Sequence, residues 1–207
     1  MGYTIEDWKN RLAERSDLST SIVHLTKTNI TNNLVEQLLT ILNDKKLIGS
    51  TTQSGFIIGN KPAVCFQDAP LHGIAQNVWF EQKYRKENPS AKVRYNAGGF
   101  AFKKNYAYSK GVRPVVYEET TRAKEMLPDK EWWRIVNFNL SNDDAIIDWT
   151  HEREWRCPIE FNFEISEVTV LLPNHKIYQK FIKDCEDKNL DFHKKIRGIV
   201  VMSEVLY

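Results

Sequence analysis

Apolar residues near the start of the chain recur with the period of a helix. Ile5, Trp8 and Leu12 would share one helical face, which we expect to dock on the rest of the protein. Thr4 precedes this pattern as an N-cap, and Asn33 precedes a stronger amphipathic pattern in the same way. The helices predicted in this way cover residues 4–15, 34 to the turn at Gly49, 72–87, 121–127 and 175–188.

Later in the chain, short runs of β-branched and aromatic residues are bounded by turn residues, which predicts strands. These runs cover residues 21–26, 63–66, 99–102, 112–117, 134–140, 167–172 and 196–202. Because helices interrupt them only at intervals, we predict an α+β fold with a curved or split sheet and flanking helices. The sequence has no Gly-x-Gly-x-x-Gly after a strand and no Walker-type Gly-Lys-Ser/Thr, which excludes Rossmann and P-loop nucleotide binders.

Composition narrows the class of protein further. The 207 residues are 42% hydrophobic and 12% aromatic, which suits a single globular domain over residues 1–207. A formal net charge of +2 gives no overall field toward nucleic acid or anionic membrane. Three separated cysteines without a Cys-x-x-Cys spacing indicate free thiols in a reducing compartment. Residues 1–15 lack the apolar run of a signal peptide or membrane span, so we expect a cytoplasmic protein with no membrane partner.

The most informative motif is the run WTHEREWR over residues 149–156, which leads into a strand-like region. Its Glu152 and Glu154 form a Glu-x-Glu pair, a pattern similar to that of ADP-ribosyltransferases that use NAD. The same carboxylates, with Arg153 and Arg156, would also fit an exposed face of ion pairs, each of which contributes only about 0 to 1 kcal/mol. Both interpretations are open at this point.

Further blocks resemble, in order and rough spacing, the AbiGi family of bacterial abortive phage-infection proteins. They are VCFQDAPL (64–71), GGFAFKK (98–104), GVRPVVY (111–117) and EREWR (152–156), and the resemblance covers about residues 22–172. The opening IVHLT (22–26), followed by the amphipathic helix, also resembles DarT-type DNA ADP-ribosyltransferases. Together these resemblances imply an NAD-dependent ADP-ribosyltransferase of phage defence or a toxin–antitoxin system, with a cognate toxin or antitoxin as partner. The AbiGi label of antitoxin leaves a non-catalytic antitoxin or nucleotide sensor of the same fold as the alternative.

The transfer of ADP-ribose from NAD requires a carboxylate in the active site. The glycosidic bond of NAD breaks through an oxocarbenium-like transition state, which a carboxylate near the ribose 2′-hydroxyl stabilises. Glu154 is our candidate for this group. Glu152 lies two positions earlier, on the same side of an extended segment, where it could orient or deprotonate the nucleophile. Loss of the main carboxylate should lower the rate by roughly two to four orders of magnitude.

Four residues are candidate contacts to NAD. His24 and Thr26 face the same side of a strand, where they could bind the adenosine-side ribose; a satisfied structural histidine is the alternative. Tyr106 could stack on nicotinamide, although most tyrosines are core or surface residues. Arg113, at the start of a strand, could clamp the pyrophosphate or form a structural ion pair. The other tyrosines considered for stacking are Tyr95, Tyr108 and Tyr117.

Two further features bear on the reaction. His151 lies beside Glu152 and three residues after Asp148, which raises a metal-dependent nuclease, but the spacing lacks a His-x-x-x-His or clustered-carboxylate pattern, so we predict no metal ligand. Basic residues alternate with aromatic ones over residues 83–86 and 92–95, a pattern that favours single-stranded nucleic acid as the acceptor. A solvated helix face explains the first run equally well, and a protein acceptor stays open.

Overall fold

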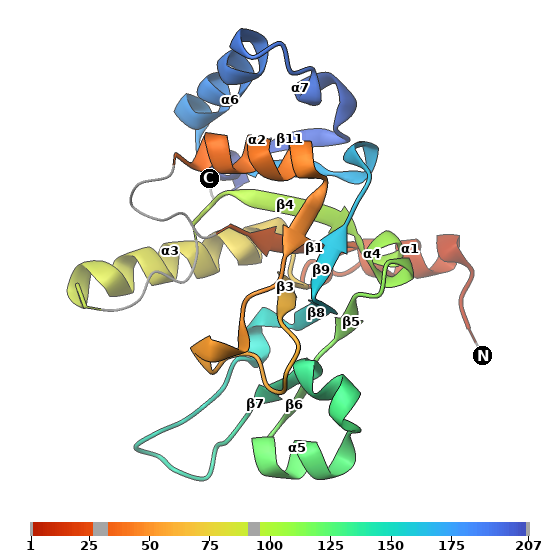
Figure 1. Cartoon of the computed structure of the whole chain (residues 1–207), viewed down its shortest axis with the longest axis vertical. Coiled ribbons are helices and arrows are strands. Elements are labelled where there is room, and N and C mark those ends of the chain that lie inside the picture. The colour runs from red at the N-terminus through yellow and green to blue at the C-terminus, as the bar shows by residue number, and fades with distance from the viewer. Residues whose placement is uncertain (1, 27–32, 91–95, 206–207) are drawn as a thin grey trace. The chain divides into compact units, whose positions relative to one another are not determined.

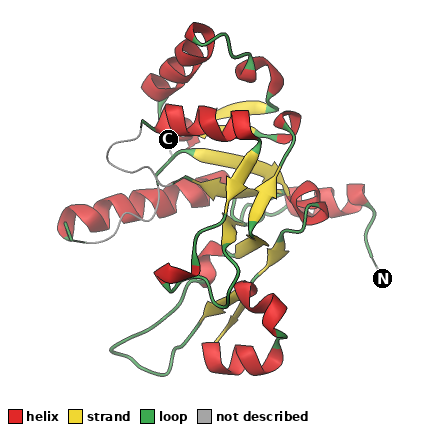
Figure 2. Ribbon diagram, in the orientation of Figure 1, coloured by secondary structure: helices red, strands yellow, loops and turns green. Residues whose placement is uncertain are grey.

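The computed structural model describes residues 2–26, 33–90 and 96–205, and its chain divides into two compact units. The first unit consists of Met1–Lys45, Ala69–Lys104 and Phe163–Tyr207, and the second of Lys46–Asp68 and Asn105–Asn162. Helices and strands are mixed in both, so the predicted combination of α and β structure with flanking helices is confirmed (Figure 2). The single domain expected over residues 1–207 stays a prediction.

The first unit contains four neighbouring strands in the order β11-β10-β4-β1 (Figure 1). Their bounds are Ser21–Leu25 for β1, Gly99–Lys103 for β4, Thr169–Leu172 for β10 and Gly198–Val201 for β11. Strand β4 is antiparallel to both β1 and β10, whereas β10 and β11 are parallel. Each lies within or overlaps a run predicted from the sequence. The helices of this unit are α1 (Ile5–Ala13), α2 (Leu34–Asp44), α3 (Leu71–Glu87), η4 (Ile165–Glu167), α6 (His175–Asp187), α7 (Phe192–Lys195) and η5 (Met202–Val205).

Side-chain caps begin these helices where the sequence predicts them. Thr4 accepts a hydrogen bond from the backbone N–H of Asp7, and Asn33 accepts one from Val35. Helix α1 nevertheless contains no buried residue, and Ile5 is half exposed, so the docking face expected of this helix is only partly covered by the protein.

The end of α2 differs from the prediction. We expected its unit to end at Gly49, but the helix ends at Asp44 and the left-handed residue that follows it is Lys45, with φ 54°. Gly49 has a different reason to be glycine, because a Cβ there would lie 2.6 Å from the carbonyl oxygen of Ile159. Helix propensities favour glycine at the left-handed C-terminal position, but here Lys45 occupies that position and Gly49 allows a close tertiary contact.

An apolar core holds the first unit together. Val23 of β1, Ala101 of β4 and Leu171 of β10 form a buried cluster, against which Ile74 of α3 and Met202 pack. Burial of such side chains stabilises by roughly 1.5 to 3 kcal/mol each. The sheet of this unit is therefore held by the hydrophobic effect.

The strands of the second unit pair in three groups. Strand β8 (Glu154–Pro158) pairs antiparallel with β3 (Ala63–Gln67) and with β5 (Arg113–Pro114). Its other pairs are β2 (Lys46–Ile48) with β9 (Glu160–Asn162), antiparallel, and β6 (Val116–Glu118) with β7 (Ile135–Asn137), parallel. Its helices are η1 (Thr52–Ser54), α4 (Lys104–Ser109), which begins at the unit boundary, α5 (Thr120–Met126), η2 (Asp129–Arg134) and η3 (Thr150–Glu152).

Two strand predictions in this unit need correction. The single strand expected over residues 112–117 is interrupted at Val115, whose N–H bonds to the carbonyl oxygen of Glu154, so that β5 joins β8 while β6 joins β7. The strand expected over 134–140 is shorter because Arg134 ends a 3-10 helix and β7 ends at Asn137. Among the described residues, no helix is both long and apolar enough to cross a membrane.

Candidate functional site

Strands β3 and β8 bring a row of polar side chains onto one face of the second unit. The register places Gln67 opposite Glu154 and Cys65 opposite Arg156. Because side chains alternate along a strand, these four lie on the same face of the pair. Gln67, Glu154 and Arg156 are only 5%, 7% and 3% exposed. Long charged side chains are almost never buried to this extent unless they are paired.

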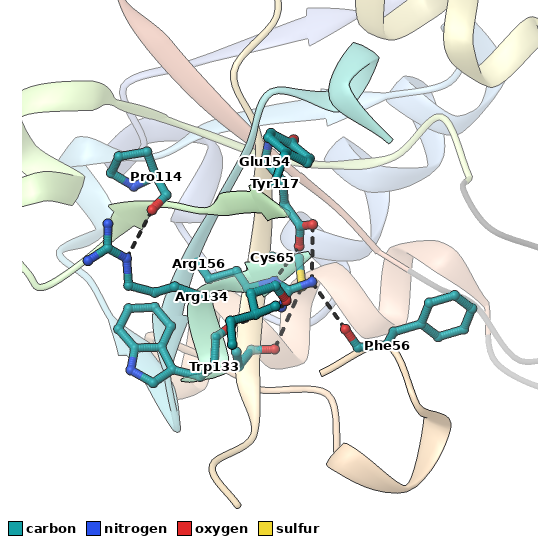
Figure 3. A network of polar contacts seen from close by, with 10 residues as sticks. Phe56, Cys65, Pro114, Tyr117, Trp133, Arg134, Glu154 and Arg156 are labelled. Carbon is teal, nitrogen blue, oxygen red and sulfur yellow. Dashed lines mark hydrogen bonds and ion pairs between the residues drawn. The ribbon is translucent and has the colours of Figure 1, made fainter. Parts of the chain in front are cut away.

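Glu154 and Arg156 form a bidentate ion pair (Figure 3). Arg156 Nε donates to Glu154 Oε1 at 2.7 Å, and Arg156 NH2 donates to Oε2 at 3.2 Å. Arg156 gives the buried carboxylate a partner of opposite charge, without which its charge would be costly in a medium of low dielectric. The exposed ion-pair face considered from the sequence is thus replaced by a buried pair.

Backbone carbonyls take the remaining donors of Arg156. Its NH1 group donates to the carbonyl oxygens of Trp133 and Ile135, both at 2.9 Å, and NH2 donates to that of Phe56 at 3.2 Å (Figure 3). With the two bonds to Glu154, the guanidinium's five N–H groups meet five acceptors within the described part of the chain. Arg156 therefore joins two backbone segments, at Phe56 and at residues 133–135, to the Glu154 carboxylate.

Tyr117 and Cys65 complete the surroundings of Glu154. The backbone N–H of Glu154 donates to the Tyr117 hydroxyl at 2.7 Å. Burial, with a further contribution from the charge of Glu154, raises the pKa of Tyr117 to about 12, so its hydroxyl is protonated at neutral pH. Burial and the same charge raise the pKa of the Cys65 thiol well above its usual value. Cys65 is thus a protonated thiol and not a nucleophile.

Gln67 is the residue of this face that the sequence analysis missed. Its Oε1 atom is buried and has no hydrogen-bond partner among the described residues. A buried polar atom without a partner costs roughly 1 to 3 kcal/mol, so such atoms are rare in native proteins. A glutamine that ends the apolar strand β3 was the available signal, but its meaning depends on the register with β8.

The chain from Glu152 to Glu154 is not extended, although the prediction of a shared side assumed that it was. Glu152 belongs to η3, and Arg153 follows in the left-handed region with φ 44°, so β8 begins only at Glu154. The alternation that would place both carboxylates on one side holds for extended chain and fails at this turn. The backbone carbonyls of Glu152 and Arg153 accept hydrogen bonds from the N–H of Asp68.

Arg113 and Tyr106 also lie in the second unit. Arg113 donates to the carbonyl oxygens of Tyr108 and Val112 at 2.7 and 2.8 Å, and its guanidinium lies 3.8 Å from the centre of the Tyr108 ring. It thereby closes the end of α4 in the structure. Tyr106, on α4, meets the ring of Phe161 edge to face. Their predicted contacts to pyrophosphate and nicotinamide stay predictions.

His24 and Thr26 belong to the first unit. His24 is half-buried on β1, opposite Phe100 of β4. Thr26 is buried, and its hydroxyl donates to the carbonyl oxygen of Gly98 at 3.0 Å. That hydroxyl already holds the chain at the end of β1, which the sequence did not indicate. The role of both residues as NAD contacts stays a prediction.

The remaining candidates concern metal and nucleic acid. Within the described ranges, no group of three or more His, Cys, Asp and Glu side chains is arranged to hold a metal ion. Asp148 accepts two hydrogen bonds from Thr150, which lower the pKa of its carboxyl group, and the His151 ring lies against Trp149. Residues 92–95, part of the basic and aromatic pattern, and with them Tyr95, lie outside the described residues.

Comparison of the chain with protein-family models, curated proteins and solved structures finds no match.

Proposed function

We propose that this chain transfers ADP-ribose from NAD to an acceptor, with Glu154 as the carboxylate that stabilises the charge developing on the ribose. The observation that carries the proposal is a carboxylate that is buried and held in an ion pair by Arg156 at the first residue of β8. A fixed charge in surroundings of low dielectric interacts strongly with a developing charge and needs no reorganisation during the reaction.

In this reaction NAD is a substrate. The bond between ribose C1′ and the nicotinamide nitrogen breaks, and nicotinamide leaves with the electron pair. The acceptor's nucleophile then forms the new bond at C1′, and its proton passes to a base, the role proposed for Glu152. Glu154 would accept a hydrogen bond from the ribose 2′-hydroxyl. Arg156 uses two of the roughly four acceptor positions of a carboxylate, so Glu154 keeps acceptor capacity for a ligand.

The sequence resemblance supports the wider setting of this proposal. Similarity to AbiGi and DarT-type proteins favours an ADP-ribosyltransferase-like curved or split sheet, a role in bacterial phage defence, and control by a cognate toxin or antitoxin in the cytoplasm. In that setting His24, Thr26, Tyr106 and Arg113 are the proposed NAD contacts.

The acceptor we propose is single-stranded nucleic acid, and helix α3 supports it. Trp79, Phe80 and Tyr84 are 57%, 63% and 46% exposed, and the rings of Phe80 and Tyr84 are stacked with an interplanar angle of 17°. Lys83 and Lys86 are exposed on the same stretch of helix. Unpaired bases stack on exposed aromatic rings while cations bind the phosphates, whereas exposed aromatics of this size are uncommon on a merely solvated helix face.

A second candidate is a non-catalytic antitoxin or nucleotide sensor of the same fold. The observation that favours it is the ion pair of Glu154 with Arg156, because Arg156 contacts both carboxylate oxygens and offsets their charge. A carboxylate neutralised in this way can position a ligand without stabilising a cation. The two candidates differ in turnover and agree in NAD binding.

The test is incubation of purified protein with labelled NAD and with single-stranded DNA, duplex DNA, RNA or cell lysate. Wild type is compared with Glu154→Gln, which keeps the size of the side chain, and with Glu160→Gln of β9 as a control carboxylate away from the pair. We expect label transfer to single-stranded nucleic acid, and a loss of roughly two to four orders of magnitude in Glu154→Gln alone.

Other outcomes separate the candidates. Folded wild-type protein that binds NAD but consumes none in any mixture would support the sensor or antitoxin. Transfer that persists in Glu154→Gln would remove Glu154 from the reaction. Unfolding by denaturant, measured on each variant, shows whether a lost activity reflects a lost fold.

A further inference from the structure

The side-chain carbonyl oxygen of Gln67, which has no hydrogen-bond partner among the described residues, belongs to the residue opposite Glu154 in the β3–β8 pair. This Oε1 atom is buried at the last residue of β3. Native proteins satisfy nearly all such atoms, and the exceptions call for a ligand, a bound water or a functional reason. We therefore take the Gln67 Oε1 atom to be a hydrogen-bond acceptor for a ligand, which would supply the missing donor.

The register defines what lies beside this acceptor. Gln67 and Glu154 are direct partners in the antiparallel pair of β3 and β8, so their Cβ atoms are about 4.5 to 5.5 Å apart. A carbonyl oxygen and a carboxylate on neighbouring positions offer two acceptors to one ligand. A ligand that matches them carries two adjacent hydrogen-bond donors.

The charge of the pair selects the kind of donor. Arg156 contacts both oxygens of Glu154, so the carboxylate already has a full positive charge as its partner and needs none from a ligand in the ground state. Gln67 adds no charge. Neutral hydroxyl groups therefore suit this face better than a metal ion or an ammonium group. Their small size also suits residues that are only 5% and 7% exposed.

We propose that Gln67 and Glu154 together bind the adjacent hydroxyl groups of a ribose, with Gln67 accepting from the 3′-hydroxyl while Glu154 accepts from the 2′-hydroxyl. This inference rests on the proposed function and identifies Gln67 as the residue that makes the site specific for a vicinal diol. It also accounts for a polar atom that costs stability in the free protein. A site that hydrogen-bonds a hydroxyl discriminates strongly against an analogue that lacks it, because the buried acceptor is then left unpaired.

The proposal makes stability and binding move in opposite directions. Gln67→Met keeps the length of the side chain and removes the unpaired carbonyl, so the free protein should be as stable as wild type or more stable. Its affinity for the diol should fall. If Gln67 were purely structural, its substitution would lower the stability of the protein and leave its affinity for NAD unchanged.

The experiment is calorimetric titration of the full chain with NAD and with an NAD analogue that lacks the 3′-hydroxyl of the nicotinamide ribose. The proteins are wild type, Gln67→Met and Gln53→Met, whose exposed glutamine on η1 serves as the matched control. Wild type and Gln53→Met should bind NAD roughly tenfold or more tightly than the analogue. Gln67→Met should bind both ligands equally and at the weaker level.

The failures of the two proposals differ. If wild type binds NAD and the analogue with the same affinity, the role of Gln67 is overturned while the proposed function stands, and this comparison needs no variant. The role of Gln67 is also overturned if Gln67→Met is folded and binds NAD as tightly as wild type does. A bound water would then be the partner of the Gln67 carbonyl oxygen. If folded wild type binds no NAD, both proposals fail together.

Discussion

Both units of this protein bury apolar residues, but the second unit also buries a row of polar ones. The strands of the first unit bury apolar side chains, among them Val23, Phe100 and Leu171. The second unit buries Gln67, Glu154 and Arg156 along one face of β3 and β8. Among the described residues, Thr26 is the buried polar residue of the first unit, and its hydroxyl makes one local hydrogen bond.

Apolar burial and polar burial contribute differently to the stability of the fold. Apolar burial stabilises a fold directly, whereas the desolvation of two charges can outweigh their attraction, so a buried ion pair is weak evidence for stability. The second unit retains such a pair together with an unpaired amide, and apolar residues of similar size would fill the same space. We therefore regard the polar face of the second unit as kept for binding and chemistry.

The largest expected effect is that of Arg156→Met. The substitution leaves the charge of Glu154 buried without a partner and removes the donors to three backbone carbonyls, so we expect a loss of about 3 to 5 kcal/mol in the free energy of unfolding. Urea denaturation measures it. The double variant with Glu154→Met should recover part of the loss. A loss below about 1 kcal/mol would contradict the buried-pair interpretation.

Leu171→Ala tests the first unit in a comparable way. Leu171 of β10 is fully buried in the apolar cluster, so the cavity left by its side chain should lower the free energy of unfolding by about 3 kcal/mol. The same denaturation measures this change. NAD binding by the folded variant is expected to be unchanged, and a variant that kept wild-type stability would show that this core is loosely packed.

Tyr117→Phe should have a smaller effect at neutral pH. It removes the acceptor of the Glu154 N–H and should cost about 1 kcal/mol. Burial raises the pKa of Tyr117 to about 12, so the folded protein keeps a proton that the unfolded chain loses near pH 10. Stability present below pH 10 therefore declines as the pH rises toward 12, and Tyr117→Phe should lack this part of the decline. Equal alkaline slopes for the two proteins would disprove the assignment.

The smallest effect is expected for an ion pair on the surface. Lys183 and Asp187 of α6 approach to 2.6 Å, but both side chains are largely exposed and screened by solvent. Lys183→Ala should leave the urea midpoint without a measurable change, which contrasts with Arg156→Met. A clear drop would show that exposure is a poor guide to the value of an ion pair in this protein.

Much of the local structure could be predicted because its causes are local. Thr4 and Asn33 cap helices through their own side chains, and the apolar spacing of α2 is complete within one segment. The end of α2 at Lys45 could not be predicted, since propensity assigns the left-handed cap to glycine and the chain uses Gly49 for a close backbone contact.

The candidate site could be predicted only in part. Glu154 and Arg156 stand two residues apart, so the sequence already suggested an ion pair. Its burial depends on backbone carbonyls from distant segments, which carry no side-chain signal. The pairing of Gln67 with Glu154 depends on the β3–β8 register. The turn between Glu152 and Glu154 depends on the left-handed conformation of Arg153, an uncommon state for a residue with a side chain.

The bonds of Arg156 also bear on the order of events in folding. This side chain joins carbonyls of Phe56 and Trp133, which lie 100 and 23 residues away along the chain. Closing both loops has an entropic cost before either contact forms, so these bonds are expected to form after the transition state. Substitutions at Arg156 should then accelerate unfolding while leaving the refolding rate almost unchanged. Arg156, which holds the Glu154 carboxylate, would thus slow the unfolding of the second unit.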